Sequence, residues 1–301
     1  MTVPSLIERP AQLEAFVAEA LQAPWLGLDT EFVRDRNYFP RAGLIQIATP
    51  DAVALVDPVA LEDLSALAPL LFATKVEKIL HAGRQDLELF VLLFDRVPAP
   101  LFDTQTAADL IGLAPQIGYA TLVAELLSAD TGRSLGRYDW LRRPLAPEAL
   151  DYAAGDVHYL AVLRDILQPR LATAGKETTF TEAMTHAADP ALYRPDPEGA
   201  WRRVHAARRL RGNALVRFKA LAAWREKQAI AEDRPRQWIL RDGPLVAIAR
   251  NGPCNTEGFA AIHGLNPSAR RRYTPEMLAV MASAGAGYEN DRDGASLTVD
   301  A

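Results

Sequence analysis

Residues 25–32 read Trp25-Leu26-Gly27-Leu28-Asp29-Thr30-Glu31-Phe32, an apolar run that two acids interrupt. This pattern predicts a β-strand, in which successive side chains point to opposite faces. Asp29 and Glu31 therefore share one face, about 7 Å apart along the chain. Two such carboxylates repel each other and are costly to bury, and a divalent cation with oxygen ligands removes that cost. Alone, the pair is also compatible with a strand end at which one acid caps a turn.

The flanking sequence predicts a mixed sheet with helices beside it. Thr49-Pro50-Asp51 separates two short apolar runs as a hairpin turn. The further predicted strands are 44–48, 52–56, 76–80 and 101–102, and the predicted helices are 10–21, 61–72, 84–94, one from 103, 119–127, and 147 to about 171. Strands in meander order, followed by alternating strands and helices, are typical of an α/β sheet flanked by helices.

Regular periodicity ends near residue 172. Residues 173–200 contain no sustained period and carry three prolines near their end, which predicts a linker. Residues 201–282 predict an all-helical unit, and the small, polar and acidic residues 283–301 predict a disordered tail. The expected division is a catalytic domain at 1–172, the linker, the helical domain and the tail.

The composition predicts an ordinary globular protein of 301 residues, with 49% hydrophobic and 24% charged residues. The N-terminal residues lack the pattern of a signal peptide, and no apolar run reaches the roughly 18 residues of a membrane helix. The single cysteine, Cys254, forms no internal disulfide, which favours the cytoplasm. One Cys and five His exclude a Cys/His zinc module, so we expect any metal to be bound by carboxylates.

The net charge of −5 hides an asymmetry along the chain. Residues 201–280 contain 16 Arg or Lys against 6 Asp or Glu, whereas residues 1–200 contain 16 basic against 28 acidic residues. An acidic unit followed by a basic one fits a catalytic body with a polyanion-binding domain. Two solvated surfaces that differ by drift would give the same counts.

Two later places carry further acids. Asp86 falls in the first turns of a predicted helix, where the helix dipole also favours an acid. Tyr152 and Asp156 are spaced i and i+4 and share one helix face, with small residues between them that allow close packing. Each place alone is compatible with an ordinary surface or partly buried side chain. Taken together with the first pair, they give four acids and a tyrosine beside apolar core sequence.

This order of Asp-x-Glu, Asp and Tyr-x-x-x-Asp resembles the proofreading-type 3′–5′ exonucleases whose four acids hold two metals, in the subgroup with a tyrosine. Further segments over about residues 5–170 resemble ribonuclease D: 28–32 (LDTEF), 43–47 (GLIQI), 81–88 (HAG and DLE), 102–105 (FDTQ), 118–123 (GYATLV), 139–145 (DWLRRPL) and 152–160 (YAAGDVHYL). At residues 221–225, 235–240, 245–249, 253 and 262–265, the C-terminal unit is similar to the HRDC domain, a helical nucleic-acid-binding domain that ribonuclease D shares with RecQ-type helicases.

The resemblance implies a ribonuclease H-like mixed sheet followed by a small all-α HRDC-like domain. It implies a 3′–5′ exoribonuclease that trims tRNA precursors and other structured RNA to nucleoside 5′-monophosphates with two Mg²⁺ or Mn²⁺ ions. Asp29 would bridge both metals, Glu31 and Asp156 would complete the first site, and Asp86 would serve the second. Tyr152 would orient the attacking water, because a phenol of pKa near 10 is a poor base at neutral pH.

Several residues in the matching segments are candidates for substrate binding. Aromatic side chains stack on bases and arginines pair with phosphates. The candidates are Thr30, Phe32, His81, Arg137, Tyr138, Trp140 and Arg143. The alternatives are that Trp140 anchors its loop, that Phe32 is a core residue, and that His81 and Gln46 are packing residues. The arginine run at 270–272 is explained as well by a solvated helix face.

The chain departs from the family pattern in two ways. It is long enough for one HRDC-like domain, whereas bacterial ribonuclease D often carries two. Arg133 stands where a lysine is usual, and Leu135-Gly136 replace polar residues. The alternatives are a DNA 3′–5′ exonuclease of the same superfamily and a non-catalytic RNA-binding protein that keeps the fold. We expect a cytoplasmic monomer that binds RNA and neither a membrane nor a protein partner.

Overall fold

The computed structural model describes residues 4–132, 135 and 138–296. The chain divides into two compact units. The first contains the residues up to 33 together with 40–194, and the second contains residues 34–39 and those from 195 onward. Within the described residues, no helix combines the length and apolarity needed to cross a membrane.

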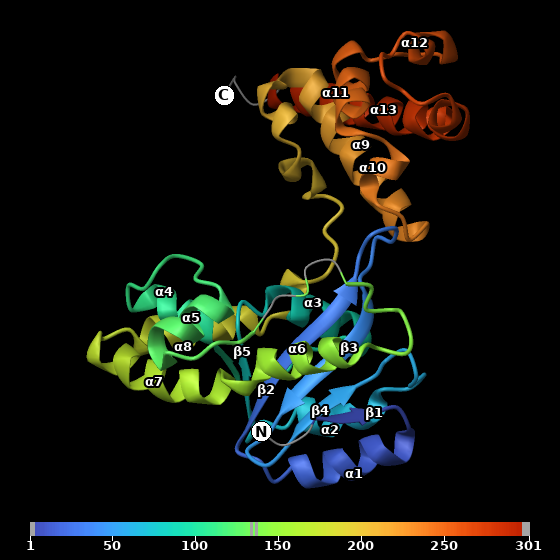
Figure 1. Cartoon of the computed structure of the whole chain (residues 1–301). Coiled ribbons are helices and arrows are strands. Elements are labelled where there is room, and N and C mark those ends of the chain that lie inside the picture. Colours follow the sequence, from blue (N-terminus) through green and yellow to red (C-terminus); the bar gives the residue numbers. More distant parts are fainter. Residues whose placement is uncertain (1–3, 133–134, 136–137, 297–301) are drawn as a thin grey trace. The chain divides into compact units, whose positions relative to one another are not determined.

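The first unit is built on a six-stranded sheet with the strand order β1-β4-β3-β2-β5-β6 (Figure 1). Strands β2, β3 and β4 form an antiparallel meander, whereas β1, β5 and β6 pair in parallel with their neighbours. The strands are β1 (Ser5–Ile7), β2 (Trp25–Val33), β3 (Arg41–Ala48), β4 (Val53–Val56), β5 (Glu77–Leu80) and β6 (Leu101–Asp103). The sequence predicted this mixed sheet but missed β1, which is only three residues long.

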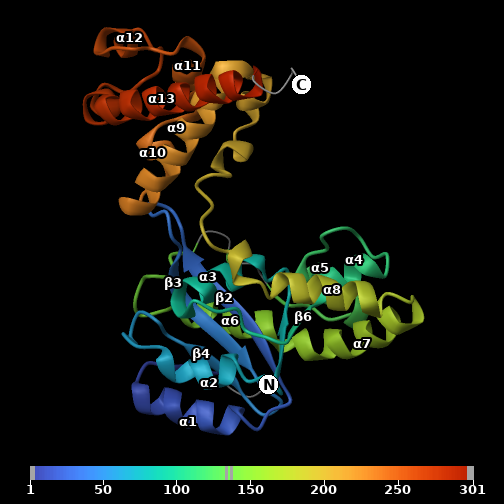
Figure 2. The same ribbon diagram turned by 180° about the vertical axis from the view of Figure 1, so that it is seen from behind.

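Helices cover both faces of this sheet. Helix α6 crosses one face in Figure 1, and α1 and α2 lie over the other face in the opposite view of Figure 2. The α-helices of this unit are α1 (Pro10–Ala20), α2 (Ala68–Leu71), α3 (Arg84–Phe94), α4 (Thr104–Leu110), α5 (Tyr119–Leu127), α6 (Pro147–His158), α7 (Leu160–Thr173) and α8 (Glu177–Ala187). The predicted α/β fold class, a mixed sheet flanked by helices, is confirmed.

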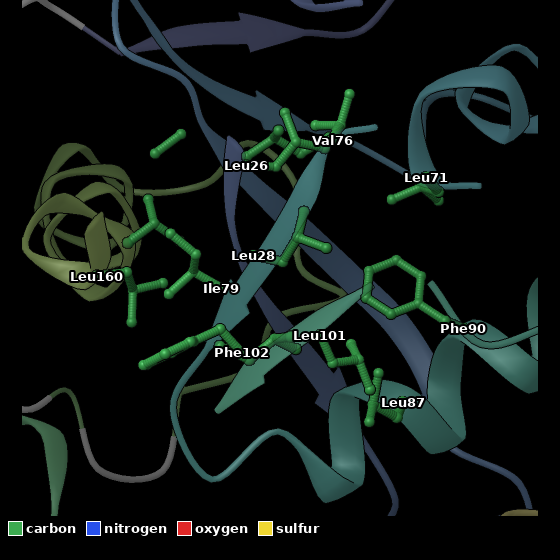
Figure 3. Close-up of a cluster of buried hydrophobic side chains, with 14 of the residues drawn as sticks. Leu26, Leu28, Leu71, Val76, Ile79, Leu87, Phe90, Leu101, Phe102 and Leu160 are labelled. Atoms are coloured by element: carbon green, nitrogen blue, oxygen red, sulfur yellow. The ribbon is translucent and has the colours of Figure 1, made fainter. Parts of the chain in front are cut away.

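The alternation of β2 sorts its side chains between the core and the site. Leu26 and Leu28 are fully buried in the main hydrophobic cluster, which also contains Phe90 of α3 and Phe102 of β6 (Figure 3). Asp29 and Glu31 point to the opposite face, where they pair in register with Gln46 and Leu44 of β3. A register shift follows Glu31, so the two acids occupy the last regular positions of the ladder.

Four elements differ from the sequence-based expectation. The predicted helix 61–72 is reduced to a 3₁₀ turn (Ser65–Leu67) and α2. The predicted linker 173–200 contains α8, which buries Phe180 and Met184 in the core of the first unit. Helix α13 continues to Ser296, through most of the segment predicted to be a disordered tail. The long helix expected from residue 147 to about 171 breaks at Tyr159 into α6 and α7.

The second unit is helical and has its own core. Its elements are two 3₁₀ turns (Ala200–Arg203 and His205–Arg209), α9 (Gly212–Ala231), α10 (Arg236–Ile239), α11 (Asp242–Asn251), α12 (Thr256–Ala260) and α13 (Pro267–Ser296). Phe218, Phe259 and Met277 are fully buried in this core. Residues 34–39, which connect β2 to β3, belong to the same unit: Asn37 Nδ2 donates to Asp233, and the Tyr38 hydroxyl donates to the buried Glu226.

A buried ion pair fixes the loop at residues 138–146 in the first unit. The Asp57 side chain, which has no exposed surface, accepts hydrogen bonds from Arg143 Nε at 2.6 Å and Nη2 at 2.5 Å. The same guanidinium donates to the carbonyls of Gly43 and Trp140. A Cβ atom at Gly43 would lie 2.6 Å from the Trp140 Cβ, so glycine is required for this close approach.

We predict that Arg143→Met lowers the free energy of unfolding by about 3 kcal/mol, because it leaves the buried Asp57 carboxylate without its partner. Urea unfolding followed by circular dichroism measures this loss. Arg142→Met is the matched control, since Arg142 is exposed and no ion pair of its side chain occurs among the described residues. Equal losses in both variants would contradict the role of the ion pair.

Candidate active site

Three carboxylates from two elements meet beside the sheet. Asp29 and Glu31 lie on β2, and Asp156 lies on α6. One carboxylate oxygen from each of these residues lies within 4.8 Å of the others. Helix α6 can pack this closely because its sheet-facing positions include the fully buried Ala149 and Ala153. The sequence predicted that these three acids belong to one site, and the structure brings them together.

The fourth predicted acid, Asp86, approaches from α3. It is buried, and its Oδ1 accepts a hydrogen bond from the Thr30 hydroxyl at 2.5 Å. Thr30 therefore contacts Asp86 through its side chain, whereas the sequence singled it out as a candidate for substrate binding. After the larger effect of burial, the charges of Asp86 and Asp156 contribute to the raised pKa of both Asp29 and Glu31, so all four acids belong to one electrostatic system.

Burial raises the pKa of each acid, and repulsion from the other acids adds to the shift at Asp29 and Glu31. Burial raises the pKa of Glu31 to about 8, and the charges of Asp156 and Asp86 add to the effect. Burial also raises the pKa of Asp156 to about 7 and that of Asp86 to about 6, although hydrogen bonds oppose both shifts. Burial and then the other three acids raise the pKa of Asp29 well above its ordinary value. Such crowding of negative charge is what a bound cation would neutralise.

Tyr152 lies on α6 one turn before Asp156, in the position predicted for it. Burial raises the pKa of its phenol, and the charges of Asp156 and Glu31 raise it further. The phenol is therefore a neutral hydrogen-bond donor at physiological pH. Its ring is 6.2 Å from the ring of Trp140, measured between centroids. Trp140 is buried in the cluster that packs α6 on the sheet, so the loop at 138–146 supports the Tyr152 ring.

The other substrate-binding candidates lie in different environments. Phe32 is partly exposed and is not among the buried core residues, which leaves its ring available for stacking. The Tyr138 hydroxyl accepts a hydrogen bond from the Ala146 N–H, and the Arg143 guanidinium is engaged by Asp57. Arg137 lies outside the described residues. An RNA contact for any of these residues remains a prediction.

Both ring nitrogens of His81 have hydrogen-bond partners. Its Nε2 lies 3.0 Å from the Ile117 carbonyl, which can only accept, and its Nδ1 lies 2.9 Å from the Thr104 hydroxyl. Burial lowers the pKa of the ring, so it is neutral at physiological pH. The ring packs edge-on against Tyr119 at 5.7 Å between centroids. These contacts indicate a supporting role for His81, the alternative that the sequence left open.

Sequence reasoning gave less weight to three residues around the acids. Gln46 is fully buried opposite Asp29, and neither of its amide atoms has a hydrogen-bond partner among the described residues. The Tyr119 hydroxyl contacts α6 beside Asp156. Asp57 anchors the Trp140 loop. Gln46 could be found from the sequence, because it is a polar residue within an apolar strand. Tyr119 and Asp57 could not, because their partners lie more than 30 residues away in sequence.

Comparisons with known proteins agree with this geometry. A family model described as 3′-5′ exonuclease matches residues 4–172, and an HRDC domain model matches residues 214–281. Ribonuclease D of Acidiphilium cryptum is 38% identical over 267 residues, which are 87% of this chain and 67% of that protein. The chain spans 57% to 67% of the length of the first curated ribonuclease D proteins that it matches.

The chain is also similar to solved structures. Escherichia coli RNase D, described as an exoribonuclease involved in structured RNA processing, matches with a TM-score of 0.85 and 32% identity over 93% of this chain and 75% of its own. Brucella melitensis NrnC with bound Mg²⁺ matches with a TM-score of 0.53 and 25% identity over 63% of this chain and 89% of its own. The exonuclease domain family is metal-dependent, and the acidic cluster provides suitable ligands.

The family match, the similarity to curated relatives and the four acids on β2, α3 and α6 together establish that this chain belongs to the ribonuclease D family of 3′–5′ exoribonucleases, with an HRDC domain in its C-terminal part.

Proposed function

We propose that this chain hydrolyses RNA from the 3′ end, trims tRNA precursors and other structured RNA, and releases nucleoside 5′-monophosphates. The convergence of the Asp29, Glu31 and Asp156 carboxylates within 4.8 Å, with Asp86 beside them, is the observation that carries the proposal. The description of the Escherichia coli relative supports structured RNA as the substrate class. The cytoplasmic location and the monomeric state remain predictions.

The residues of the site fit two divalent metal ions. All donors are carboxylate oxygens, which hard cations such as Mg²⁺ and Mn²⁺ prefer. Glu31 and Asp156 would hold the first ion, Asp86 would hold the second, and Asp29 would contribute to both. When bound, such ions lower the pKa of a water molecule and neutralise charge on the scissile phosphate.

The protein groups would orient the reactants around the acids. Tyr152, a neutral donor beside Asp156, would hold the attacking water by a hydrogen bond. Phe32 would stack on the terminal base from the end of β2, because its ring is partly exposed next to Glu31. The RNA is thereby held with its 3′ end at the carboxylates, which accounts for exonucleolytic rather than internal cleavage.

A direct test uses a 3′-extended tRNA and a matched DNA strand, each labelled at the 5′ end, with Mg²⁺, with Mn²⁺ and with a chelator. We expect a metal-dependent ladder that shortens from the 3′ end and forms faster on RNA. Faster shortening of DNA would assign the chain to the DNA exonucleases. Binding of RNA without shortening would identify a non-catalytic RNA-binding protein.

In this assay Asp29→Asn should reduce the rate by about 10³-fold or more, because loss of metal binding removes roughly 4 kcal/mol of transition-state stabilisation. In chelator, the thermal midpoint of this variant should equal or exceed that of the unsubstituted protein, since the substitution relieves repulsion among the acids. Asp51→Asn, at an exposed hairpin turn, is the control. Normal activity in Asp29→Asn would refute the assignment of the site.

The raised pKa values predict that a rise in pH lowers the stability of the metal-free protein and increases its affinity for metal. In chelator, the free energy of unfolding should fall as the pH rises from about 5 to 8, since the folded protein releases protons from Asp86, Asp156 and Glu31 at pH values of about 6, 7 and 8. The Mn²⁺ concentration for half-saturation should fall over the same range, because protons compete with the metal.

Calorimetric titration with Mn²⁺ and urea unfolding at several pH values measure the two effects. Asp156→Asn should flatten both pH profiles, because it removes one titrating acid and part of the repulsion on Glu31. A Mn²⁺ affinity that is independent of pH between 6 and 8 would show that the acids do not bind the metal.

The helical unit offers a second surface for RNA. A groove of about 560 Å³ is lined by residues of α10, of the turn before α13 and of the first turns of α13, which include Arg272; Arg234, Arg241 and Pro244 complete the lining. Trp238 at its rim is 51% exposed, and Arg234 Cζ lies 5.9 Å from its ring centroid. Arg234 and Arg272 pair with Glu232, whereas Arg241 is exposed and has no ion pair among the described residues. An exposed aromatic ring beside arginines suits single-stranded RNA.

We predict that Trp238→Ala weakens RNA binding about tenfold, within the range for loss of one stacked base. Arg241→Gln should lower the slope of log K against log salt by about 1, because it removes one phosphate contact. Fluorescence anisotropy with a labelled RNA at several salt concentrations measures both quantities. Arg250→Gln, exposed on α11 and absent from the groove lining, should leave the slope unchanged.

A further inference from the structure

No proline accounts for the break between α6 and α7. Helix α6 ends at His158 and α7 begins at Leu160, with Tyr159 between them at φ −98° and ψ −2°. Sharp interruptions of helices usually occur at proline, at small-residue pairs, or where a side chain enters the backbone hydrogen-bond ladder. The prolines on either side of Tyr159 are distant in sequence: Pro147 precedes it by 12 residues, and Pro169 follows it by 10 residues.

A hydroxyl group from another helix enters the ladder at this point. Tyr119, the first residue of α5, donates its phenol hydrogen to the Gly155 carbonyl at 2.9 Å. The phenol oxygen of Tyr119 also accepts a hydrogen bond from the Tyr159 N–H at 3.0 Å. In a continuous α-helix the Tyr159 N–H would donate directly to the Gly155 carbonyl. The Tyr119 hydroxyl therefore separates the two partners of a single helical hydrogen bond and bridges them.

The separated turn carries one of the four acids. Asp156 immediately follows Gly155, and its carboxylate lies within 4.8 Å of those of Asp29 and Glu31. The Tyr119 hydroxyl contacts the backbone directly before Asp156, and the charges of Asp156 and Asp29 contribute to its raised pKa after the larger effect of burial.

The position of the phenol is itself fixed. Its ring packs edge-on against the His81 ring, and His81 is held by the Thr104 hydroxyl and the Ile117 carbonyl. Ile117 lies two residues before Tyr119, so the same contact also fixes the start of α5. The hydroxyl therefore has little freedom to leave the helical ladder.

We propose that Tyr119 is a positioning residue for the metal site: its hydroxyl opens the α6–α7 helix at Gly155 and thereby directs the Asp156 carboxylate toward Asp29 and Glu31. This inference rests on the proposed function, in which those acids bind metal. A purely structural alternative is that the hydroxyl only satisfies two backbone groups at the end of α6. The alternatives differ in whether loss of the hydroxyl changes metal affinity.

The test compares Tyr119→Phe with Tyr193→Phe in the full-length protein. Each substitution removes one phenol hydroxyl that donates to a backbone carbonyl of the first unit, and each keeps the ring; the Tyr193 hydroxyl donates to the Ala187 carbonyl at 2.7 Å. In Tyr119→Phe, the Tyr159 N–H can bond directly to Gly155, which lengthens α6 and displaces Asp156. Mn²⁺ binding is measured by electron paramagnetic resonance, and kcat and KM for RNA are measured at low and high metal.

We expect Tyr119→Phe to weaken Mn²⁺ binding about tenfold or more, a typical cost of losing a group that orients a metal ligand. Its kcat should fall at low metal and recover at high metal, with KM for RNA unchanged. Tyr193→Phe should retain the Mn²⁺ affinity. Equal Mn²⁺ affinity in all three proteins would overturn the inference, whatever the change in thermal stability.

The design separates this inference from the proposed function. If the unsubstituted protein binds Mn²⁺ but leaves RNA intact, the exonuclease proposal fails, and the Mn²⁺ affinities still decide the role of Tyr119. If the unsubstituted protein binds no Mn²⁺, both proposals are overturned.

Discussion

The repulsion among four carboxylates is the constraint on which the rest of this structure depends. Asp29 and Glu31 are adjacent on one face of β2 because of strand periodicity, and Asp86 and Asp156 are added by two helices. Folding therefore brings like charges together in a partly desolvated place, and burial raises the pKa of each of them. The packing that surrounds them must supply the free energy for this arrangement: α6 lies close on the sheet through alanines, and the Arg143–Asp57 ion pair holds the Trp140 loop beside it. The proposed metal ions would relieve this repulsion.

Several polar groups contact the acids or the backbone beside them. Thr30 donates to Asp86, Tyr119 bridges the backbone beside Asp156, and Tyr152 contributes a phenol to the same turn. None of these three groups is a cation, so the negative charge of the acids remains available to a metal. Gln46 opposes stability, because its amide is fully buried opposite Asp29 with no hydrogen-bond partner among the described residues. An unpaired buried amide costs roughly 1–3 kcal/mol, which is a substantial fraction of the stability of an ordinary domain.

Sequence periodicity predicted most of the fold, because the strands and helices of the first unit bury regular apolar faces. The bounds of α3 and α5 agree with the predicted ones, and β2 covers the predicted strand that carries Asp29 and Glu31. Helix α8 was missed because its apolar positions are sparse and only packing on the core selects them. The break at Tyr159 could not be predicted, since its cause is a hydroxyl group 40 residues earlier in the chain. The ion pair of Arg143 with Asp57 likewise joins residues 86 positions apart, so sequence alone offered phosphate binding as the simpler role for the arginine.

The segment at residues 34–39 also bears on how this protein can be divided. Because it leaves β2 three residues after Glu31 and belongs to the helical unit, the polypeptide crosses between the two units after residues 33, 39 and 194. The C-terminal part is therefore not a module that can be cut off at a single peptide bond. A truncation after residue 194 would leave Asn37 and Tyr38 without Asp233 and Glu226, and would free the end of the strand that carries the acids. Gene fusions, limited proteolysis and domain exchange within this family would face the same restriction wherever this connection is retained.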